Sequence, residues 1–419
     1  MDVVIGGQVE PGFAAVKEAF THNFEVGREI GAAFCLHVGG RKVVDLYGGY
    51  VDPEGSRPYD QDTLQLVFSS TKGATAVCAN LLAQRGELDV YAPVADYWPE
   101  FAQGGKGDIP VLHLLSHQAG LPAVDARLSA EEVQAWDPVV TALSEQTPFW
   151  EPGTAHGYHA LAYGWLVGEV VRRITGRTVG RFFADEIAGP LGLDFWIGLP
   201  DEQEHRVSPV VGTLVSRGGT AGADSGADPS GDGSGKGAGD GAPLGALPPN
   251  FSSTLLARAL NFGGAYSDPH WANQREWHAA EVPAANGITN AASLSRLYAG
   301  LIGTVEGGPD ESILTKAQVD EARIVRTFGP DQVFLSVGFP LEQHIGQGFW
   351  ISSPFALFGG EGSFGHSGAG GSYGFADPEN NLAVGYVMNK MSNAVTGDAR
   401  ARRLIKACYE SVGATPKYF

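Results

Sequence analysis

Hydrophobic residues recur with two different periods along the chain and divide it into strand-rich ends and a helix-rich middle. Residues 11–24 have helical spacing, and two β-rich runs then flank the pair Gly39-Gly40. A glycine pair between two such runs is typical of a β-hairpin. From residue 108 to residue 193, helical patterns dominate and strand-like runs are almost absent, and a β-like pattern returns only briefly at 206–214.

The C-terminal part returns to strand-like runs. They cover residues 332–341, 346–353, 363–379 and 381–389, and a last helical pattern covers residues 395–412. We therefore predict an α/β (α+β) fold, in which strands from both ends of the chain form one central antiparallel sheet flanked by the terminal helices. The expected division is a sheet domain of residues 1–68 and 327–419, with a mostly helical region of residues 69–326 inserted in it.

Residues 216–249 interrupt the helix-rich region with a different composition. Gly, Ala, Asp, Ser and Pro dominate there, and bulky apolar side chains are nearly missing. Such a segment buries too little apolar surface to offset the entropy lost on ordering. We expect a flexible surface insertion, and the irregular aspartate spacing argues against a calcium-binding glycine repeat.

Charge and cysteine content restrict the partners and the compartment. The formal net charge is −19, and no basic stripe is present. This charge argues against nucleic acid and anionic membranes as partners, because both require clustered Lys and Arg. Cys35, Cys78 and Cys408 lie far apart in apolar settings without metal spacing. Together with an N-terminus that lacks signal-peptide features, this predicts a cytoplasmic protein with reduced cysteines and no metal or cofactor.

One short stretch carries candidate chemistry. Ser69-Ser70-Thr71-Lys72 stands where an apolar helical pattern begins, and Lys72 alone among nine lysines has a serine three residues before it. One interpretation is a set of helix-capping hydroxyls followed by an exposed lysine. The other is the Ser-x-x-Lys pair of a serine acyl-enzyme. Residues three apart share a helix face, so Lys72 would lie beside Ser69 and could act as its base if burial lowered the lysine pKa.

The order of further segments adds a resemblance to a known family. The segments are "SSTKG" at 69–73, "IPVLHLLSHQAGLP" at 109–122 and "EPGTAHGYHALAYGW" at 151–165. Together they resemble the serine β-lactamase-like superfamily, specifically its class C-like branch, and within it family VIII carboxylesterases most closely. The resemblance covers nearly the whole chain except 216–249 and implies a β-lactamase/penicillin-binding-protein-like fold.

The resemblance also implies further site residues. The family's Tyr-x-Asn motif corresponds to Tyr158-His159-Ala160, where the tyrosine is present and the asparagine is not. The family's Lys-Thr-Gly motif corresponds to His366-Ser367-Gly368, followed by Ala369. By this resemblance Tyr158 shares the base role with Lys72, and His366 orients substrate or donates a hydrogen bond to Tyr158. The backbone N–H groups of Ser69 and Ala369, next to Gly368, hold the oxyanion.

Two other patterns point to different chemistry and are weaker. Residues 370–374 fit Gly-x-Ser-x-Gly around Ser372, but a nucleophile elbow needs a helix after it, and here a strand-like run follows. His113 and His117 are four apart, yet Leu114 stands where a zinc-binding His-Glu-x-x-His motif has glutamate. We expect both patterns to be structural.

These observations favour a serine carboxylesterase acting on short-chain neutral esters through an acyl-enzyme. A neutral histidine at position 366 is a weaker partner for a substrate carboxylate than lysine. Three alternatives remain open: a β-lactamase or D-Ala-D-Ala carboxypeptidase, an acyltransferase on the same fold, and a non-catalytic binding protein. The expected partner is a small-molecule ester, and the oligomeric state is not predicted.

Overall fold

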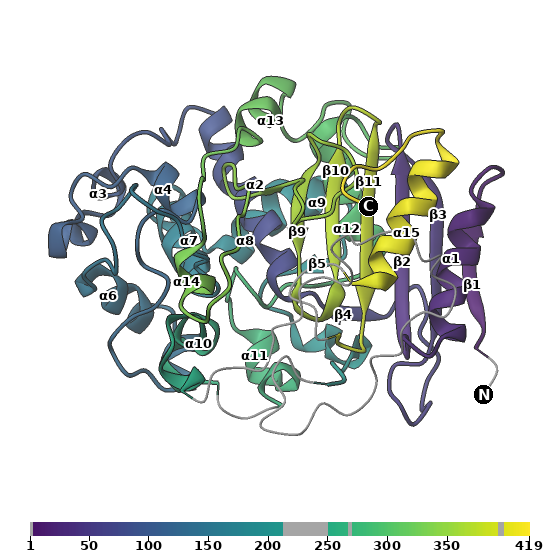
Figure 1. The fold of residues 1–419 in the computed structure, drawn as a ribbon, viewed down its shortest axis with the longest axis horizontal. Coiled ribbons are helices and arrows are strands. Elements are labelled where there is room, and N and C mark those ends of the chain that lie inside the picture. The colour runs from purple at the N-terminus through teal and green to yellow at the C-terminus, as the bar shows by residue number, and fades with distance from the viewer. Residues whose placement is uncertain (1–2, 213–249, 267–269, 393–397) are drawn as a thin grey trace.

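A seven-stranded antiparallel sheet built from both ends of the chain forms one side of the molecule (Figure 1). The computed structural model describes residues 3–212, 250–266, 270–392 and 398–419. In spatial order the strands are β1 (Ile5–Val9), β3 (Arg41–Gly49), β2 (Gly31–Val38), β11 (Leu382–Met388), β10 (Tyr373–Asp377), β9 (Phe364–Ser367) and β8 (Trp350–Ile351). The N-terminal strand β2 thus pairs directly with the C-terminal strand β11.

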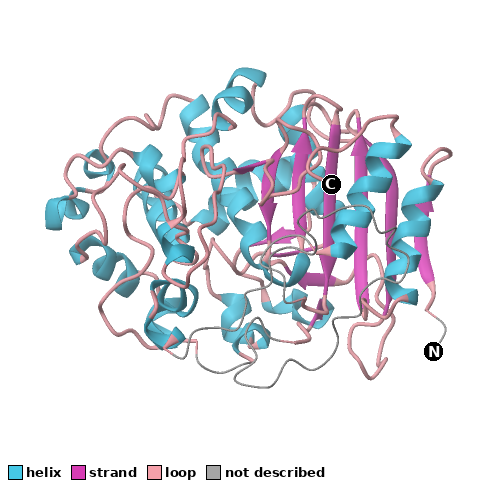
Figure 2. Cartoon of the chain, viewed as in Figure 1, coloured by secondary structure: helices cyan, strands magenta, loops and turns pink. Residues whose placement is uncertain are grey.

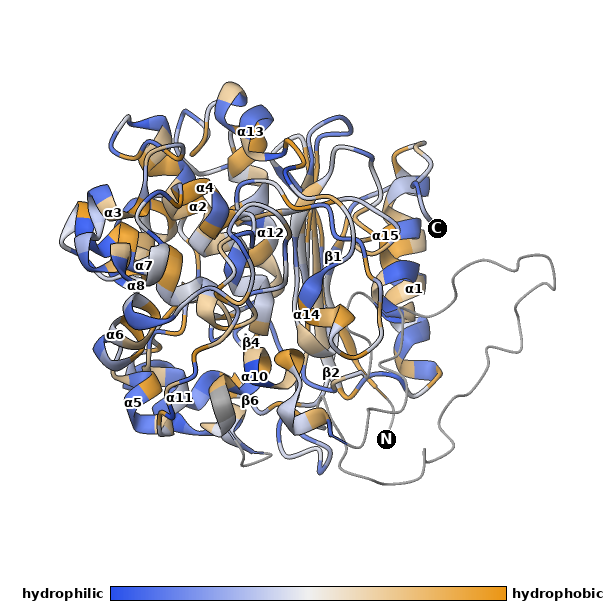
Figure 3. Cartoon of the chain, turned by 60° about the vertical axis from the view of Figure 1, so that its left-hand side comes forward, coloured by the Kyte–Doolittle hydropathy of each residue, from blue (hydrophilic) through white to orange (hydrophobic). Residues whose placement is uncertain are grey.

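Three helices cover the two faces of this sheet. Helices α1 (Ala14–Glu25) and α15 (Ala399–Ser411) pack side by side on one face, and α12 (Ala291–Ile302) packs against β2, β10 and β11 on the other. In α1 the buried residues Val16, Phe20 and Phe24 recur every fourth position, so one stripe of the helix faces the sheet. Figure 3 shows hydrophilic and hydrophobic residues interspersed along both terminal helices, as expected for half-buried elements.

The rest of the described chain is mostly helical and lies beside the edge of the sheet formed by β8 and β9 (Figure 2). Its helices are α2 (Thr71–Gln84), α3 (Val94–Tyr97), α4 (Val111–Leu115), α5 (Ala130–Gln134), α6 (Asp137–Glu145), α7 (Ala162–Thr175), α8 (Val179–Phe183), α9 (Gly189–Leu191), α10 (Leu255–Asn261), α11 (Arg275–Ala279), α13 (Lys316–Ala322) and α14 (Gln332–Leu335). A small second sheet joins β5 (Phe195–Trp196), β7 (Ile288–Thr289), β4 (Leu64–Leu66) and β6 (Val207–Ser208). None of the described helices combines the length and apolar character needed to cross a membrane.

The fold class predicted from the periodicity is confirmed, including the hairpin at Gly39-Gly40 and the helices near both ends. The strand prediction for residues 332–341 is wrong, because this segment begins with helix α14. Asp331 caps that helix by accepting the N–H groups of Val333 and Phe334, a local signal that outweighs the alternating apolar pattern. The expected insertion 216–249 lies outside the described residues, and the domain boundaries stay a prediction.

Candidate active site

Ser69 lies in a tight turn between the second sheet and helix α2. Strand β4 ends at Leu66, and the single-turn 3-10 helix η1 (Phe68–Ser70) follows. Phe68 adopts a left-handed φ of 44°, a conformation that costs a non-glycine residue roughly 1–3 kcal/mol. The Thr71 hydroxyl donates to the Phe68 carbonyl at 2.5 Å and helps to hold this turn. As a result Ser69 stays partly exposed where helix α2 begins, although both its neighbours are buried.

The neighbouring hydroxyl groups do not cap α2, so the capping interpretation of this stretch is wrong. Ser70 occupies the N-cap position without a side-chain capping bond. Its Oγ instead contacts the His366 carbonyl at 3.4 Å and Ser372 Oγ at 3.2 Å. The hydroxyl next to the candidate nucleophile therefore joins the turn to strand β9.

Lys72 is fully buried and lies beside Ser69, contrary to the alternative of an exposed lysine. Its Nζ is 3.1 Å from Ser69 Oγ. The same nitrogen donates to the carbonyl of Ala160 at 2.7 Å and to that of Ala284 at 2.9 Å. No carboxylate oxygen lies within ion-pair distance of this amine in the part of the chain that the structure describes. Burial lowers the pKa of Lys72 well below the ordinary value of lysine.

The protonation state of Lys72 decides what it can do for Ser69. A neutral amine has two N–H donors and one lone pair. The carbonyls of Ala160 and Ala284 accept the two N–H groups, which leaves the lone pair available to the Ser69 hydroxyl. This arrangement has the geometry of a base beside a nucleophile.

Tyr158 lies on the other side of Lys72, in the loop before α7. Its ring centroid is 4.8 Å from Lys72 Nζ, and the Ser69 side chain interacts with its hydroxyl. Burial raises the pKa of Tyr158 above that of a free phenol, although the Ser69 hydrogen bond acts in the opposite direction. The phenol therefore stays protonated at neutral pH and can donate a proton.

Asp331 positions Tyr158 from the far side and was missed by the sequence analysis. Its buried carboxylate accepts the Tyr158 N–H at 2.8 Å, in addition to the two N–H groups of α14. Burial raises the pKa of Asp331 to about 7, against the effect of these N–H donors. An Asp before a short apolar run is a helix N-cap signal, but the alternating pattern of residues 332–341 favours a strand and hides it.

His366 lies in β9, with its ring stacked on Trp350 at 4.1 Å and facing Tyr158 at 6.1 Å between centroids. Burial, followed by the nearby Lys72 charge, lowers the pKa of His366 well below that of free histidine. Its Nδ1–H donates to the Ser367 carbonyl at 2.6 Å. In the neutral ring Nε2 then carries no proton, and this buried atom has no partner among the described residues. His366 can therefore accept a hydrogen bond but not donate one to Tyr158, which corrects the expectation.

Gly368 and Ala369 bring a backbone N–H close to the turn that carries Ser69. A Cβ atom on Gly368 would lie 2.1 Å from the Val67 carbonyl oxygen, so only glycine allows β9 to approach the Ser69 turn this closely. Ala369 begins the short helix η8 (Ala369–Gly371). Across the described residues, neither Ser69 N–H nor Ala369 N–H has an acceptor outside its own single-turn helix. Both are free to donate to an oxyanion.

The two weaker patterns are structural. Ser372 is fully buried, donates to the Val67 carbonyl at 2.9 Å and leads into strand β10, so the helix of a nucleophile elbow is missing. His117 lies beyond the end of α4, and its Nδ1 accepts the His159 N–H at 3.0 Å. Within the described ranges no three His, Cys, Asp or Glu side chains gather as metal ligands.

Comparisons with known proteins agree with this geometry. The family model described as Beta-lactamase matches residues 16–409. An esterase/beta-lactamase, LipL, of Mycobacterium tuberculosis is 32% identical over 92% of this chain and 83% of its own. A crystal structure of a family VIII carboxylesterase superposes with a TM-score of 0.81 and 37% identity, covering 97% of this chain and all of that one.

A penicillin-binding protein homologue from Caulobacter crescentus superposes equally well, with a TM-score of 0.81 and 37% identity over 97% of this chain. Esterase EstB of Burkholderia gladioli is 29% identical over 43% of this chain. The family match spans the sheet and the helical region together, and both carry groups of the site described above. The chain therefore belongs to the beta-lactamase family, as a serine hydrolase related to the family VIII carboxylesterases.

Proposed function

We propose that this protein is a carboxylesterase that hydrolyses short-chain neutral esters through a covalent acyl-enzyme on Ser69. The observation that carries the proposal is the environment of Lys72, a buried amine held by two carbonyls with Ser69 Oγ at 3.1 Å. The esterase names of two relatives support the choice of ester substrates.

In the proposed reaction, the Lys72 lone pair takes the Ser69 proton as Oγ attacks the ester carbonyl. The N–H groups of Ser69 and Ala369 donate to the oxyanion, the interaction that usually contributes most to acyl transfer. Tyr158 gives its proton to the leaving alkoxide and is restored by the Lys72 ammonium. Water then attacks the acyl-enzyme with the same groups in reversed order, and no cofactor takes part.

The neutral ring of His366 favours substrates that carry no carboxylate. A neutral ring with an acceptor nitrogen offers no cation to a substrate carboxylate, unlike the lysine of the Lys-Thr-Gly motif that the family resemblance implies. The absence of such a charged hydrogen bond weakens recognition by about 1.5–3 kcal/mol, or roughly 10- to 150-fold. Recognition of a neutral ester does not need a cation at position 366. The neutral His366 ring therefore favours neutral esters over lactams and peptides.

Beta-lactam hydrolysis is the second candidate, because the name of the Mycobacterium tuberculosis relative includes it. Comparing kcat/KM for p-nitrophenyl butyrate and nitrocefin decides between the two. We expect kcat/KM to be much higher for the ester than for nitrocefin. His366→Lys should lower the ratio of these two values. Equal kcat/KM for both substrates in the parent enzyme would contradict the esterase assignment.

The nucleophile is tested with three serine variants and a fluorophosphonate probe. Ser69→Ala should abolish both labelling and ester turnover, because no other described serine has a lysine amine as base. Ser372→Ala should still be labelled, and Ser411→Ala, on the remote helix α15, is the matched control with full activity. Loss of labelling in Ser372→Ala with labelling kept in Ser69→Ala would contradict the proposal.

A further inference from the structure

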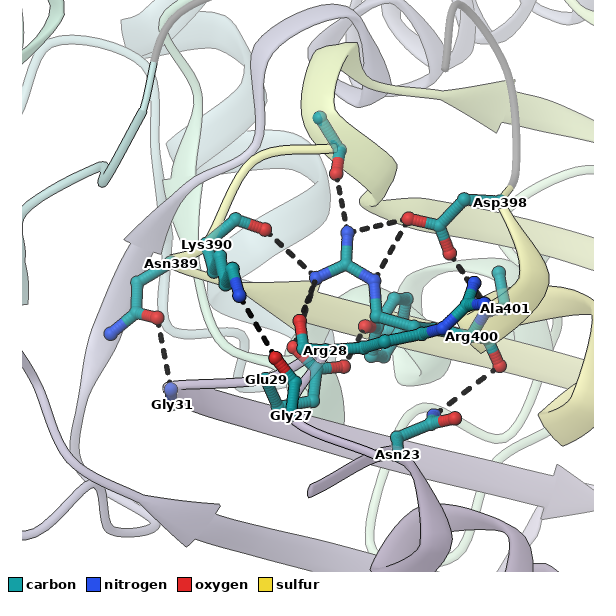
Figure 4. A network of polar contacts seen from close by, with 12 residues as sticks. Asn23, Gly27, Arg28, Glu29, Gly31, Asn389, Lys390, Asp398, Arg400 and Ala401 are labelled. Atoms are coloured by element: carbon teal, nitrogen blue, oxygen red, sulfur yellow. Dashed lines mark hydrogen bonds and ion pairs between the residues drawn. The ribbon is translucent and has the colours of Figure 1, made fainter. Parts of the chain in front are cut away.

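A buried ionic cluster lies behind the loop that carries Ala369. Arg400, near the start of α15, is only 3% exposed. Figure 4 shows its guanidinium between Glu29, which precedes β2, and Asp398, which caps α15. Arg400 Nη1 donates to Glu29 Oε2 at 3.0 Å, and Nε donates to Asp398 Oδ2 at 2.8 Å. Two acidic side chains thus contact one buried cation, and burying these groups costs free energy unless each has its partners.

The same guanidinium reaches the active-site loop. Arg400 Nη2 donates to the Gly370 carbonyl at 2.7 Å, and Nη1 donates to the Lys390 carbonyl at 2.8 Å. The peptide of Gly370 directly follows Ala369, whose N–H is the second proposed oxyanion donor. One planar side chain therefore joins the segment before β2, the end of β11 and the η8 loop. Lysine could not make these contacts together, because it lacks the rigid fork of donors.

The loop needs an external support of this kind. Gly370 and Gly371 both have positive φ, 84° and 129°, and glycine is the least conformationally restricted residue. Arg400 fits closely against the pair, since a Cβ atom on Gly371 would lie 2.8 Å from Nη2. The Gly370 carbonyl also accepts the Ser392 N–H at 2.9 Å. Oxyanion donors work only when they are held in place before the reaction.

We propose that Arg400 is a positioning residue that fixes the Ala369 N–H in the oxyanion hole, with Glu29 and Asp398 holding Arg400 in turn. This role rests on the proposed function, since it assumes that Ala369 N–H receives the oxyanion. It differs from a purely structural role because the oxyanion forms only during the reaction. Misplacing the donor therefore lowers kcat and leaves ground-state binding nearly unchanged.

The test is Arg400→Lys, measured by steady-state kinetics with p-nitrophenyl butyrate and by inhibition with an alkyl boronic acid. A boronate on Ser69 mimics the tetrahedral intermediate and its oxygen occupies the oxyanion hole. We expect kcat to fall about 100-fold, as for a displacement of about 1 Å in an active site. KM should change less than about threefold, and boronate affinity should fall in parallel with kcat/KM.

Arg172→Lys is the matched control. Arg172 also binds a buried carboxylate, Glu169, at 2.7 Å, but on helix α7 and without contact to the oxyanion loop. The Arg172→Lys protein should be less stable than the parent and should keep the parental kcat. Arg400→Lys with parental kcat and a lower melting temperature would overturn the proposal, because the cluster would then serve stability alone.

Two further variants cover the case in which Arg400→Lys does not fold. Glu29→Gln and Asp398→Asn each keep the guanidinium and remove the ionisable group of one of its anchors, and each should lower kcat at unchanged KM. Parental kcat in both overturns the proposal. The rate of fluorophosphonate labelling separates this question from substrate choice, because it depends on Ser69 and the oxyanion hole whichever ester or lactam is turned over. Slower labelling in the variants supports the Arg400 role even if the ester proposal fails.

Discussion

At the scale of single residues, the site depends on what burial does to ordinary side chains. Lys72 would be a cation in water, but removal from solvent lowers its pKa, and two carbonyls orient its amine. Burial acts on Tyr158 in the opposite sense and keeps the phenol protonated. The same physical effect therefore acts in opposite senses on the two groups proposed as base and acid beside Ser69.

The acid role proposed for Tyr158 predicts a dependence on the leaving group. A nitrophenolate leaves without a proton, whereas an alkoxide needs one. Tyr158→Phe should therefore reduce kcat/KM for ethyl butyrate by about 10²–10⁴-fold, the usual contribution of a general acid. The loss for p-nitrophenyl butyrate should be far smaller.

The two esters are compared in the parent and in Tyr158→Phe under the same conditions. Tyr163→Phe is the matched control, because Tyr163 is a buried tyrosine of α7 whose ring lies farther from Lys72 Nζ, at 5.9 Å. Equal losses for both esters in Tyr158→Phe would show that the hydroxyl does not protonate the leaving group.

At the scale of elements, the site is the contact between the edge of the large sheet and the turn before α2. Strand β9 ends at Ser367, one residue before Gly368, and the turn begins at Val67. Ser372 and Ser70 tie the two together by side-chain hydrogen bonds. Neither element could form the proposed oxyanion hole alone, since one proposed donor belongs to Ser69 and the other to Ala369.

Gly368→Ala should separate these two elements. The φ of Gly368 is −110°, which any residue adopts, so the effect comes from the added methyl group, whose carbon would lie 2.1 Å from both the Val67 carbonyl oxygen and Ser372 Oγ. We expect a loss of about 1–3 kcal/mol of stability, as for an overpacked core, together with a fall in kcat.

Gly107→Ala is the matched control, because a Cβ atom there would meet nothing within 4 Å. Its free energy of unfolding should stay within about 0.5 kcal/mol of the parent. Urea unfolding and ester kinetics on the same preparations measure both effects. A Gly368→Ala protein with parental stability and kcat would refute the close approach of β9 to the turn.

At the scale of the whole molecule, buried titratable groups determine how stability depends on pH. Five histidines, each at most 2% exposed, have a pKa lowered mainly by burial: His37, His117, His156, His159 and His366. Among them, the pKa of His37 falls to about 3 and that of His156 to about 4. The unfolded chain therefore binds more protons at these sites below about pH 6.5.

Two buried carboxyls act in the opposite direction. Burial raises the pKa of Glu29 and of Asp331 to about 7. Their stabilising contribution to the free energy of unfolding is therefore fully present below about pH 4 and is lost as the pH rises to about 7. The histidine contribution is present above about pH 6.5 and is lost as the pH falls, at about 1.4 kcal/mol per unit for each histidine. Because the five histidines outnumber the two carboxyls, the histidine effect dominates.

We therefore predict that the free energy of unfolding falls as the pH decreases from about 7 to about 5. Urea unfolding at both pH values measures the difference. His37 lies on strand β2, remote from Ser69. His37→Asn should reduce the pH dependence of the free energy of unfolding by the contribution of one bound proton. Equal or greater stability at the lower pH would contradict the prediction.

The sequence by itself determined the parts of this protein that depend on neighbours along the chain. Apolar periodicity predicted the hairpin, the terminal helices and a sheet shared by both ends. The spacing of Ser69 and Lys72 on one helical turn already placed an amine beside a hydroxyl. A resemblance in motif order then indicated Tyr158 and the segment around Ala369.

Only the tertiary structure decided whether these residues form chemically useful groups. The carbonyls that orient Lys72 belong to residues 88 and 212 positions away in the chain, and Asp331 is 173 positions from Tyr158. Arg400 reaches Gly370 only because α15 and the η8 loop meet in the fold. A pKa or a hydrogen-bond partner depends on which groups share a desolvated space, and local spacing does not encode that.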